Sequence, residues 1–358
     1  MTEGNMTAAQ AMPGTALVLG ATGGIGGEVA AAMLRRGWRV RALVRNPAKA
    51  AAQWQRAGVA QPQWVAGDAM DAASVCAAAH GARVIVHAVN PPGYRHWERL
   101  AMPMMESTLA AARATGARIV LPGTVYNYGP DALAHCEAGG VVAEGAAQRP
   151  ATRKGGIRVQ MEARLEHAAA QEGVRTLVVR AGDFFGPHCG NSWFAQGLVK
   201  PGRVPASVVQ PGRAGIGHQW AYLPDVAETM LRLLERESEL GTFARFHMQG
   251  HWDADGIAMV RAVQRAVATR TGHAPRLAVF PWWAVGLASP VVPLFRALRE
   301  MRYVWRQPLR LDNARLLALL DAEPHTPLDD AIAATLSGLG CLPEAAAVHA
   351  IAPPAQRA

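Results

Sequence analysis

A glycine-rich segment near the start of the chain has the residue types and spacing of a phosphate-binding turn. It reads Gly20-Ala21-Thr22-Gly23-Gly24-Ile25-Gly26, after a short apolar run and before a helical pattern. Glycines at this spacing allow a tight turn, close backbone approach to a pyrophosphate and close packing of helix on strand, while the helix N-terminus offers N–H groups and the positive end of its dipole. Because of this context, we interpret the segment as a dinucleotide site rather than a plain tight turn. The expected cofactor contacts are Gly20, Thr22, Gly23, Gly24, Ile25 and Gly26.

The end of the second expected strand bears on which dinucleotide is bound. NAD sites usually place a carboxylate there for the ribose hydroxyls, whereas an arginine suits the 2′-phosphate of NADP. The chain reads Leu43-Val44-Arg45-Asn46 at this point and has no acid there. We therefore predict NADP(H), with Arg45 on the phosphate and NAD(H) as the alternative; an ordinary surface role for Arg45 stays open. Further contacts along the same groove are expected from Asp68, Ala69, Ala88, Val89 and Asn90.

Strands and helices alternate through the first half of the chain. The expected strands are Thr15–Leu19, Trp38–Val44, Gln63–Ala66, Arg83–Ala88, Arg118–Leu121 and Val174–Arg180. The expected helices are Ile25–Arg36, Pro47–Ala57, Asp71–Ala79, Arg95–Thr115 and Gln160–Gln171. Such alternation predicts an α/β fold with a doubly wound, parallel Rossmann-type sheet. Ligands of such sheets bind outside the carboxyl ends of the strands, so the residues after each strand should line the site.

The regular alternation fades after residue 181, which indicates a second lobe. We predict a dinucleotide-binding domain at 14–181, to which 216–248 returns as a strand at Gly217–Tyr222 and a helix at Pro224–Arg236. Segments 182–215 and 249–340 should form a smaller, mostly helical substrate lobe, and 1–13 and 345–358 loose tails. Residues 122–153 are an unusually long loop region and hence a functional candidate.

Composition argues against several other classes of protein. The net charge is +9, but only three of the 36 basic residues are lysines, and the arginines are spread along the chain without a basic run. We therefore expect no nucleic-acid partner and a small anionic ligand instead. The four cysteines lack C-x-x-C spacing, which argues against a disulfide framework and a zinc site, so no metal is expected. The first residues do not resemble a signal peptide, which favours a cytoplasmic protein.

An uncharged stretch at Leu277–Phe295 is a candidate for membrane contact. It contains Trp282 and Trp283, and three prolines interrupt it. A bilayer span needs about 20 predominantly apolar residues, so we expect no integral span. A buried helix from Pro281 or the wall of an apolar pocket is the favoured interpretation, and peripheral membrane contact is left open.

Several motifs in order resemble the extended short-chain dehydrogenase/reductase superfamily, which comprises NAD(P)-dependent epimerases, dehydratases and reductases. The resemblance covers roughly residues 14–340. The motifs are GATGGIG at Gly20–Gly26, GD at Gly67–Asp68, TVYNYG at Thr124–Gly129, RAGDFFGP at Arg180–Pro187 and YLPDVAE at Tyr222–Glu228. The resemblance implies hydride transfer at a carbonyl or alcohol carbon of a small organic substrate, and it is compatible with a homodimer.

The sequence departs from this family at the catalytic pair. The family's Tyr-x-x-x-Lys pair is absent, and counting back from Glu162 puts Lys154 and Arg158 at its two positions. By resemblance, Arg158 could hold a ribose or phosphate, and Lys154 could act as acid/base if nearby positive charge lowers its pKa; a solvated lysine is the alternative. Thr124 matches the family hydroxyl near the reacting oxygen, and Tyr126 is the better substitute for the missing proton donor. The catalytic candidates are therefore Thr124, Tyr126, Lys154 and Arg158.

The missing pair also leaves a second class of function open, a catalytically lapsed NADP(H)-binding sensor or scaffold. If the protein is an enzyme, the resemblance implies that the segment after Arg180 faces the nicotinamide and substrate. A metal site of His188, Cys189 and His218 is disfavoured because the spacing is not that of ligands. The expected substrate contacts are Asp183, Phe184, His188, Asn191, Trp193 and Trp220.

Overall fold

A seven-stranded parallel sheet forms the centre of the protein. The computed structural model describes residues 13–56, 58–91, 97–133 and 140–343. The strands run in the spatial order β11-β7-β5-β4-β1-β2-β3, and every neighbouring pair is parallel. Their bounds are β1 Thr15–Leu19, β2 Arg39–Val44, β3 Gln63–Ala66, β4 Ala82–His87, β5 Arg118–Thr124, β7 Thr176–Ala181 and β11 Phe243–His247. The order reverses between β1 and β4, so the predicted Rossmann-type fold is confirmed.

Helices cover both faces of this sheet, as the alternating burial of β1 requires. Ala16 and Val18 point into one core, and Leu17 and Leu19 into the other. The first core is closed by α1 (Gly24–Arg35) and α7 (Leu223–Glu235), and the second by α3 (Ala72–Ala78), α4 (Trp97–Thr115) and α6 (Arg153–Glu172). The short α2 (Pro47–Gln53) lies between β2 and β3 in the chain.

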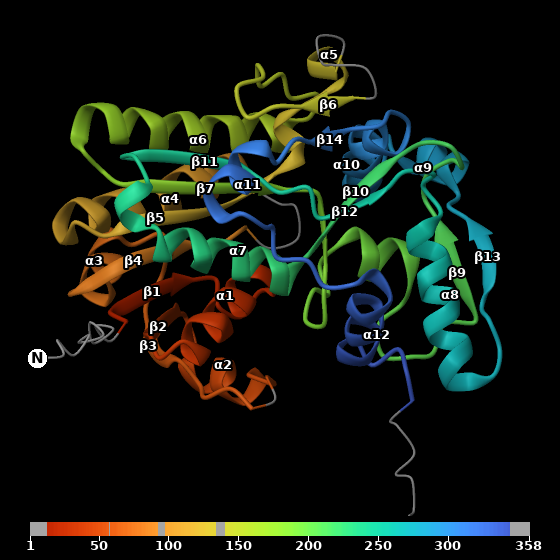
Figure 1. The fold of residues 1–358 in the computed structure, drawn as a ribbon, viewed down its shortest axis with the longest axis horizontal. Helices are drawn as coiled ribbons and strands as arrows, with labels where there is room; N and C mark the ends of the chain where they lie inside the picture. The colour runs from red at the N-terminus through yellow and green to blue at the C-terminus, as the bar shows by residue number, and fades with distance from the viewer. Residues whose placement is uncertain (1–12, 57, 92–96, 134–139, 344–358) are drawn as a thin grey trace, which may run out of the picture.

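The second lobe lies to the right of the main sheet in Figure 1 and has its own aromatic core. It is mostly helical, as predicted, and also contains short strands. Its small sheets are β8 (Asp183–Phe185), β10 (His218–Tyr222) and β12 (His251–Asp253); β9 (Ser207–Gln210) and β13 (Arg276–Val279); and β6 (Val141–Val142) and β14 (Arg310–Leu311). Its helices are α8 (Ala258–Thr271), α9 (Trp282–Ala288), α10 (Pro293–Glu300) and α12 (Leu328–Gly338). Two short helices, α5 (Pro130–Leu133) and α11 (Ala314–Leu320), lie apart from these four.

Two element predictions were wrong. The strand at 218–222 does not return to the main sheet but pairs with β8 and β12, and β11 is the strand that returns, beside β7. Helix α6 begins at Arg153 rather than at Gln160, with the Thr152 side chain accepting a hydrogen bond from the Gly155 N–H. The sequence analysis missed this first turn because residues 155 and 156 are glycines, and glycine is a poor helix former.

In the apolar stretch at 277–295 a helix starts directly after Pro281 as predicted, but it is largely exposed rather than buried, and the alternative of a pocket wall stays a prediction. The stretch divides into β13, α9 and the start of α10, and Val285 is the buried residue of α9. Among the described residues, no helix combines the length and the apolarity needed to cross a bilayer.

Candidate functional site

The glycine turn after β1 forms a cradle that only small residues permit. Gly20 has a φ of +89°, and a Cβ on it would lie 2.5 Å from the carbonyl oxygen of Ala88. A Cβ on Gly26 would lie 2.3 Å from the carbonyl oxygen of Gly20. Gly23 caps α1 without any side-chain hydrogen bond, so the helix N-terminus faces outward for an anion. These features fit the pyrophosphate of a dinucleotide.

A small pocket beside this turn contains aromatic and basic side chains that the sequence analysis did not single out. The Trp54 and Trp64 rings meet edge to face with centroids 5.7 Å apart, and Arg56 forms a buried ion pair with Glu28. Arg45, by contrast, is exposed at the end of β2 and does not line this pocket; Asp68, also exposed, accepts a hydrogen bond from the Met70 N–H. The lining residues are Ala21, Thr22, Ala50, Gln53, Trp54, Gln55, Arg56, Trp64 and His188.

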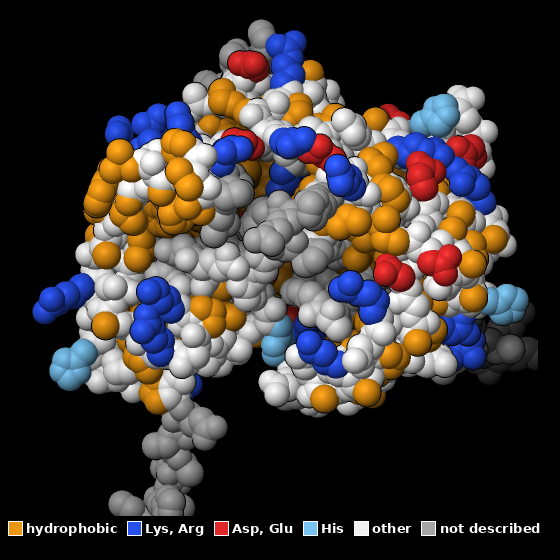
Figure 2. Space-filling model, turned by 180° about the vertical axis from the view of Figure 1, so that it is seen from behind, with side chains coloured by type: hydrophobic (Ala, Val, Ile, Leu, Met, Phe, Trp, Pro, Cys, Tyr) orange, Lys and Arg blue, Asp and Glu red, His pale blue; other side chains and the backbone are white. Residues whose placement is uncertain are grey.

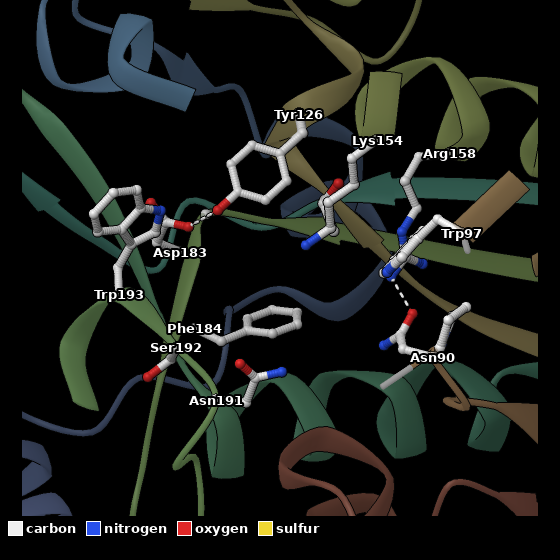
Figure 3. Close-up of a pocket in the computed structure, with 13 residues that line it drawn as sticks. Asn90, Trp97, Tyr126, Lys154, Arg158, Asp183, Phe184, Asn191, Ser192 and Trp193 are labelled. Carbon is white, nitrogen blue, oxygen red and sulfur yellow. Dashed lines mark hydrogen bonds between the residues drawn. The ribbon is translucent and has the colours of Figure 1, made fainter. Parts of the chain in front are cut away.

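A second pocket, which we call the reaction pocket, brings together all four catalytic candidates. Figure 3 shows three of them, Tyr126, Lys154 and Arg158. Thr124 ends β5, Tyr126 lies in the turn that follows, and Lys154 and Arg158 lie on the first turns of α6. Its lining residues are Asn90, Pro91, Trp97, Thr124, Tyr126, Lys154, Arg158, Gly182, Asp183, Phe184, Asn191, Ser192 and Trp193. The pocket therefore lies between the carboxyl ends of the main strands and the start of the second lobe.

A chain of buried hydrogen bonds leads from the reaction pocket into the second lobe. The Tyr126 hydroxyl donates to Asp183 Oδ1, and Asp183 Oδ2 lies 2.9 Å from His218 Nε2. His218 Nδ1 lies 3.1 Å from the carbonyl oxygen of Val304. The imidazole is stacked on Trp305, with ring centroids 3.7 Å apart. The structure thus gives each ring nitrogen of His218 an oxygen partner.

Asp183 and His218 are both proton-binding groups, and the contact between Oδ2 and Nε2 joins them. Tyr126 is therefore joined directly to a buried pair that can give or take a proton, which we call the proton store.

Lys154 and Arg158 place positive charge beside Tyr126. The Lys154 Nζ lies 5.5 Å from the centroid of the Tyr126 ring and 4.9 Å from that of Trp97. Burial, together with the nearby charge of Arg158, lowers the pKa of Lys154 to about 8. Burial likewise lowers the pKa of Arg158 to about 10, so its guanidinium stays protonated at neutral pH. Arg158 Nη2 donates to Asn90 Oδ1 over 2.7 Å, which ties α6 to the end of β4.

The remaining side of the reaction pocket comes from the second lobe. Phe184, Asn191 and Trp193 line it as predicted, and Figure 3 shows Phe184 and Asn191 facing Lys154 across the opening. Thr124 Oγ1 is buried without a hydrogen-bond partner, so it can bind a substrate oxygen. Trp97 and Ser192 were not among the predicted residues. Trp97 begins the helix after β4 and lies far from every motif in the sequence, so no motif pointed to it.

Two predicted substrate contacts lie elsewhere. His188 lines the pocket beside the glycine turn, and Trp220 borders a separate cavity with His251 and Asp253. Burial raises the pKa of the Cys189 thiol to about 12, which disfavours a nucleophilic thiolate. Within the described ranges, no group of three or more His, Cys, Asp or Glu side chains is arranged to hold a metal ion. His218 instead pairs with Asp183, a contact that sequence spacing alone does not reveal.

A buried ion pair fixes the turn that carries Tyr126. Glu162 on α6 accepts hydrogen bonds from Arg180 on β7 and from the Asn127 side chain, the latter over 2.7 Å. Arg180 also donates to the Tyr128 hydroxyl. Because all these groups are buried, the turn after β5, helix α6 and strand β7 are held in one arrangement.

Comparison with known proteins agrees with this geometry. Residues 20–131 match a family model described as NAD(P)H-binding. The matched segment begins at the glycine turn and ends just after the turn that carries Tyr126. No curated protein matches the chain.

Solved structures share the fold of the whole chain. A UDP-galactose 4-epimerase is 16% identical with a TM-score of 0.62, and MoeE5 in complex with UDP-glucose and NAD is 18% identical with a TM-score of 0.64. A UDP-glucuronic acid 4-epimerase from Bacillus cereus, in complex with UDP-glucuronic acid and NAD, is 15% identical with a TM-score of 0.67. In each case the match covers 91% of this chain and 98% of the other. At these identities, the similarity shows that the chain has the fold of these three structures.

Proposed function

We propose that the protein is an NAD(P)H-dependent oxidoreductase or epimerase-like enzyme acting at a carbonyl or alcohol carbon of a small organic substrate. The observation that carries this proposal is the Tyr126/Asp183/His218 chain, because it joins a hydroxyl in the reaction pocket to a buried proton store. NAD(P)H, when bound, supplies the hydride. The glycine cradle would hold its pyrophosphate, and Arg158 would contact its ribose or a phosphate.

Tyr126 acts as the general acid in the reducing direction. Its hydroxyl gives a proton to the substrate oxygen, and the Asp183/His218 pair then gives a proton to the phenolate once the Asp183 carboxyl group turns its protonated oxygen toward Tyr126. Solvent later restores the proton of the pair. In the oxidising direction the same groups take up the proton in reverse order. Positioned general acids of this kind contribute roughly 10²–10⁴-fold in rate.

Lys154 and Thr124 support this proton transfer. The ammonium group of Lys154 lies close to the Tyr126 ring, so it stabilises the negative charge that develops when the phenol loses its proton. The Thr124 hydroxyl is available to donate to the same substrate oxygen. Tyr126 thus transfers the proton, and Lys154 supplies the positive charge. In the family's pair, by contrast, both residues lie on one helix.

The size of the reaction pocket supports a substrate smaller than a UDP-sugar. Its volume is about 130 Å³, whereas sites for drug-sized ligands usually enclose roughly 300–1,000 Å³. Aromatic rings of Trp97, Phe184 and Trp193 form much of its wall. We therefore propose a small carbonyl or alcohol compound with an apolar part.

We propose NADP(H) over NAD(H) as the cofactor. The support is that the carboxyl end of β2 carries the exposed Arg45 and no acidic residue. A fluorescence titration with NADPH and NADH tests this preference. Arg45→Ala should weaken NADPH binding about tenfold and leave NADH binding unchanged, as expected for loss of one exposed phosphate contact. Arg39→Ala, at the opposite end of the same strand, is the control.

Turnover of NADPH with a panel of aldehydes and ketones tests the activity itself. The proposal predicts substrate-dependent oxidation of NADPH by the wild-type protein. NADPH binding without oxidation by any member of the panel would instead favour the lapsed sensor. Absence of binding to either dinucleotide would overturn both functions.

A further inference from the structure

Several large apolar side chains are exposed on the second lobe, close together in the chain. Leu277 and Val279 on β13 are 57% and 79% exposed, and Trp283 and Leu287 on α9 are 73% and 76% exposed. Val291, in the turn after α9, is 84% exposed. A single exposed apolar side chain is common on protein surfaces, whereas a group of adjacent ones marks a binding surface. We call these five residues the α9–β13 face.

Local geometry places the two residues of each element on one side of that element. Leu277 and Val279 are two residues apart on a strand, and Trp283 and Leu287 are four apart on a helix, so each pair shares a side of its element. The neighbouring Trp282 points the other way. Its indole donates to the carbonyl oxygen of Pro211 over 2.7 Å, and its ring packs against Trp193. Helix α9 is thus anchored through Trp282 while Trp283 projects outward.

Arginines are frequent in the segment that carries the α9–β13 face. From β13 to the end of β14, residues 276–311 contain six arginines and one glutamate, a formal net charge of +5 against +9 for the whole chain. Arg296 and Arg299 donate to Pro290 and Ser289 at the end of α9, and the Arg302 guanidinium lies 5.1 Å from the Trp282 ring. In Figure 2, hydrophobic side chains gather beside Lys and Arg at the upper left edge, where the turned view brings α9 and β13.

We propose that the α9–β13 face docks the protein on the surface of an anionic phospholipid bilayer. Trp and Leu side chains combined with arginines are the composition of segments that lie in the membrane interface. Basic residues near an anionic surface add electrostatic attraction, which salt screens within a Debye length. The proposal concerns attachment only, and it stands independently of the proposed activity.

A second copy of this chain is a poorer occupant for the same face. A two-fold symmetric dimer brings each surface patch against its own copy. Arg296, Arg299 and Arg302 would then lie near their symmetry mates, with Glu300 as the only acidic residue between 256 and 311. Like charges brought together in this way oppose association, whereas the same charges favour a bilayer rich in anionic lipid.

Docking would also place one wall of the reaction pocket near the bilayer. Trp193 lines that pocket and packs on Trp282, while Trp283 belongs to the α9–β13 face. The contact between the Trp193 and Trp282 rings therefore connects α9 to the wall of the pocket.

Co-sedimentation of the full chain with lipid vesicles tests the proposal. We expect the protein to bind vesicles of equal parts phosphatidylcholine and phosphatidylglycerol, and to bind vesicles of pure phosphatidylcholine only weakly. Added salt should weaken binding to the vesicles that contain phosphatidylglycerol. Trp283→Ser combined with Leu287→Ser should reduce binding at least about tenfold, because two inserted side chains are lost. Arg296→Gln combined with Arg299→Gln should reduce binding to the anionic vesicles alone.

Control variants test whether the loss of vesicle binding is specific to the α9–β13 face and its neighbouring arginines. Met70→Ser with Leu317→Ser removes exposed apolar side chains elsewhere, and Arg39→Gln with Arg83→Gln removes exposed arginines from the other domain. Both should bind vesicles like the wild type, and all variants should keep the wild-type melting temperature. Equal binding by the Trp283/Leu287 variant, or equal binding to both vesicle types, would overturn the proposal. A dimer in light scattering that this variant dissociates, without vesicle binding, would assign the face to a second copy.

Discussion

At the scale of single residues, the reaction pocket supplies an acid and a cation from unusual places. The phenol comes from Tyr126 in the turn after β5, and the cation from Lys154 on α6, where the family resemblance places a tyrosine. Asp183 and His218 add a proton store that no motif predicts, because the two residues come from neighbouring strands of a separate small sheet. Loss of the family's pair is therefore compatible with acid/base chemistry.

The pKa of Lys154 predicts how reduction depends on pH. Burial and the charge of Arg158 lower this pKa to about 8, so the amine is charged below pH 8 and neutral above it. Because the charged form stabilises the Tyr126 phenolate, kcat/KM for reduction should fall as the pH rises through about 8. Steady-state kinetics between pH 6 and 10 would reveal the inflection, because this range covers about two pH units on each side of the Lys154 pKa.

Two substitutions of Lys154 make this prediction specific. Lys154→Arg should retain activity and lose the inflection near pH 8, because a guanidinium stays charged there. Lys154→Met should be slow at every pH and show no inflection near 8. An inflection that survives in the Met variant would assign the titration to another group.

At the scale of elements, the buried pair of Glu162 and Arg180 links α6, β7 and the turn that carries Tyr126. Glu162 also accepts the hydrogen bond from Asn127, so one carboxylate joins three segments. Buried ion pairs contribute little net stability when formed, but breaking one leaves an uncompensated charge. Their benefit here is the fixed position of Tyr126 relative to Lys154.

Glu162→Gln should destabilise the protein by about 3 kcal/mol, because Arg180 would remain buried without its carboxylate. Urea unfolding monitored by circular dichroism measures this change. The control is Glu166→Gln, one turn further along α6 on an exposed position, which should change the free energy of unfolding by less than about 0.5 kcal/mol. Equal effects of the two substitutions would show that the buried pair does not hold these elements.

At the scale of the whole molecule, the sequence predicted the main sheet and its cofactor turn because local signals define both. Short apolar strands alternate with amphipathic helices, and glycine spacing marks the turn, so neither depends on distant contacts. The pairing of 218–222 was wrong because a strand pattern does not specify its neighbour. The contact between Asp183 and His218 and the exposure of Trp283 depend on how distant segments pack in the second lobe, which no local pattern encodes.

Three buried histidines predict loss of stability in acid. Burial, with nearby positive charge, lowers the pKa of His87 and His247 to about 3, and burial lowers that of His251 to about 4. The unfolded chain therefore binds more protons than the folded one below about pH 6.5, and stability is lost as pH falls toward the folded values. Each group should cost about 2 kcal/mol between neutral pH and pH 5.

Urea unfolding at pH 7 and pH 5 measures this loss for the wild type. His80→Gln combined with His273→Gln removes two exposed imidazoles and should leave the pH dependence unchanged. An unfolding free energy that stays constant from pH 7 to pH 5 would show that the three histidines are accessible to protons in the folded protein.

The central claim is that Tyr126 transfers the proton, and one pair of variants tests it most directly. Tyr126→Phe removes the hydroxyl bonded to Asp183, and Tyr303→Phe removes a hydroxyl that donates to the Tyr128 carbonyl outside the reaction pocket. With NADPH and a carbonyl substrate, Tyr126→Phe should lower kcat roughly 10²–10⁴-fold while binding NADPH like the wild type. Tyr303→Phe should keep kcat within about threefold, since it leaves the reacting groups in place. Wild-type turnover by Tyr126→Phe would contradict the account.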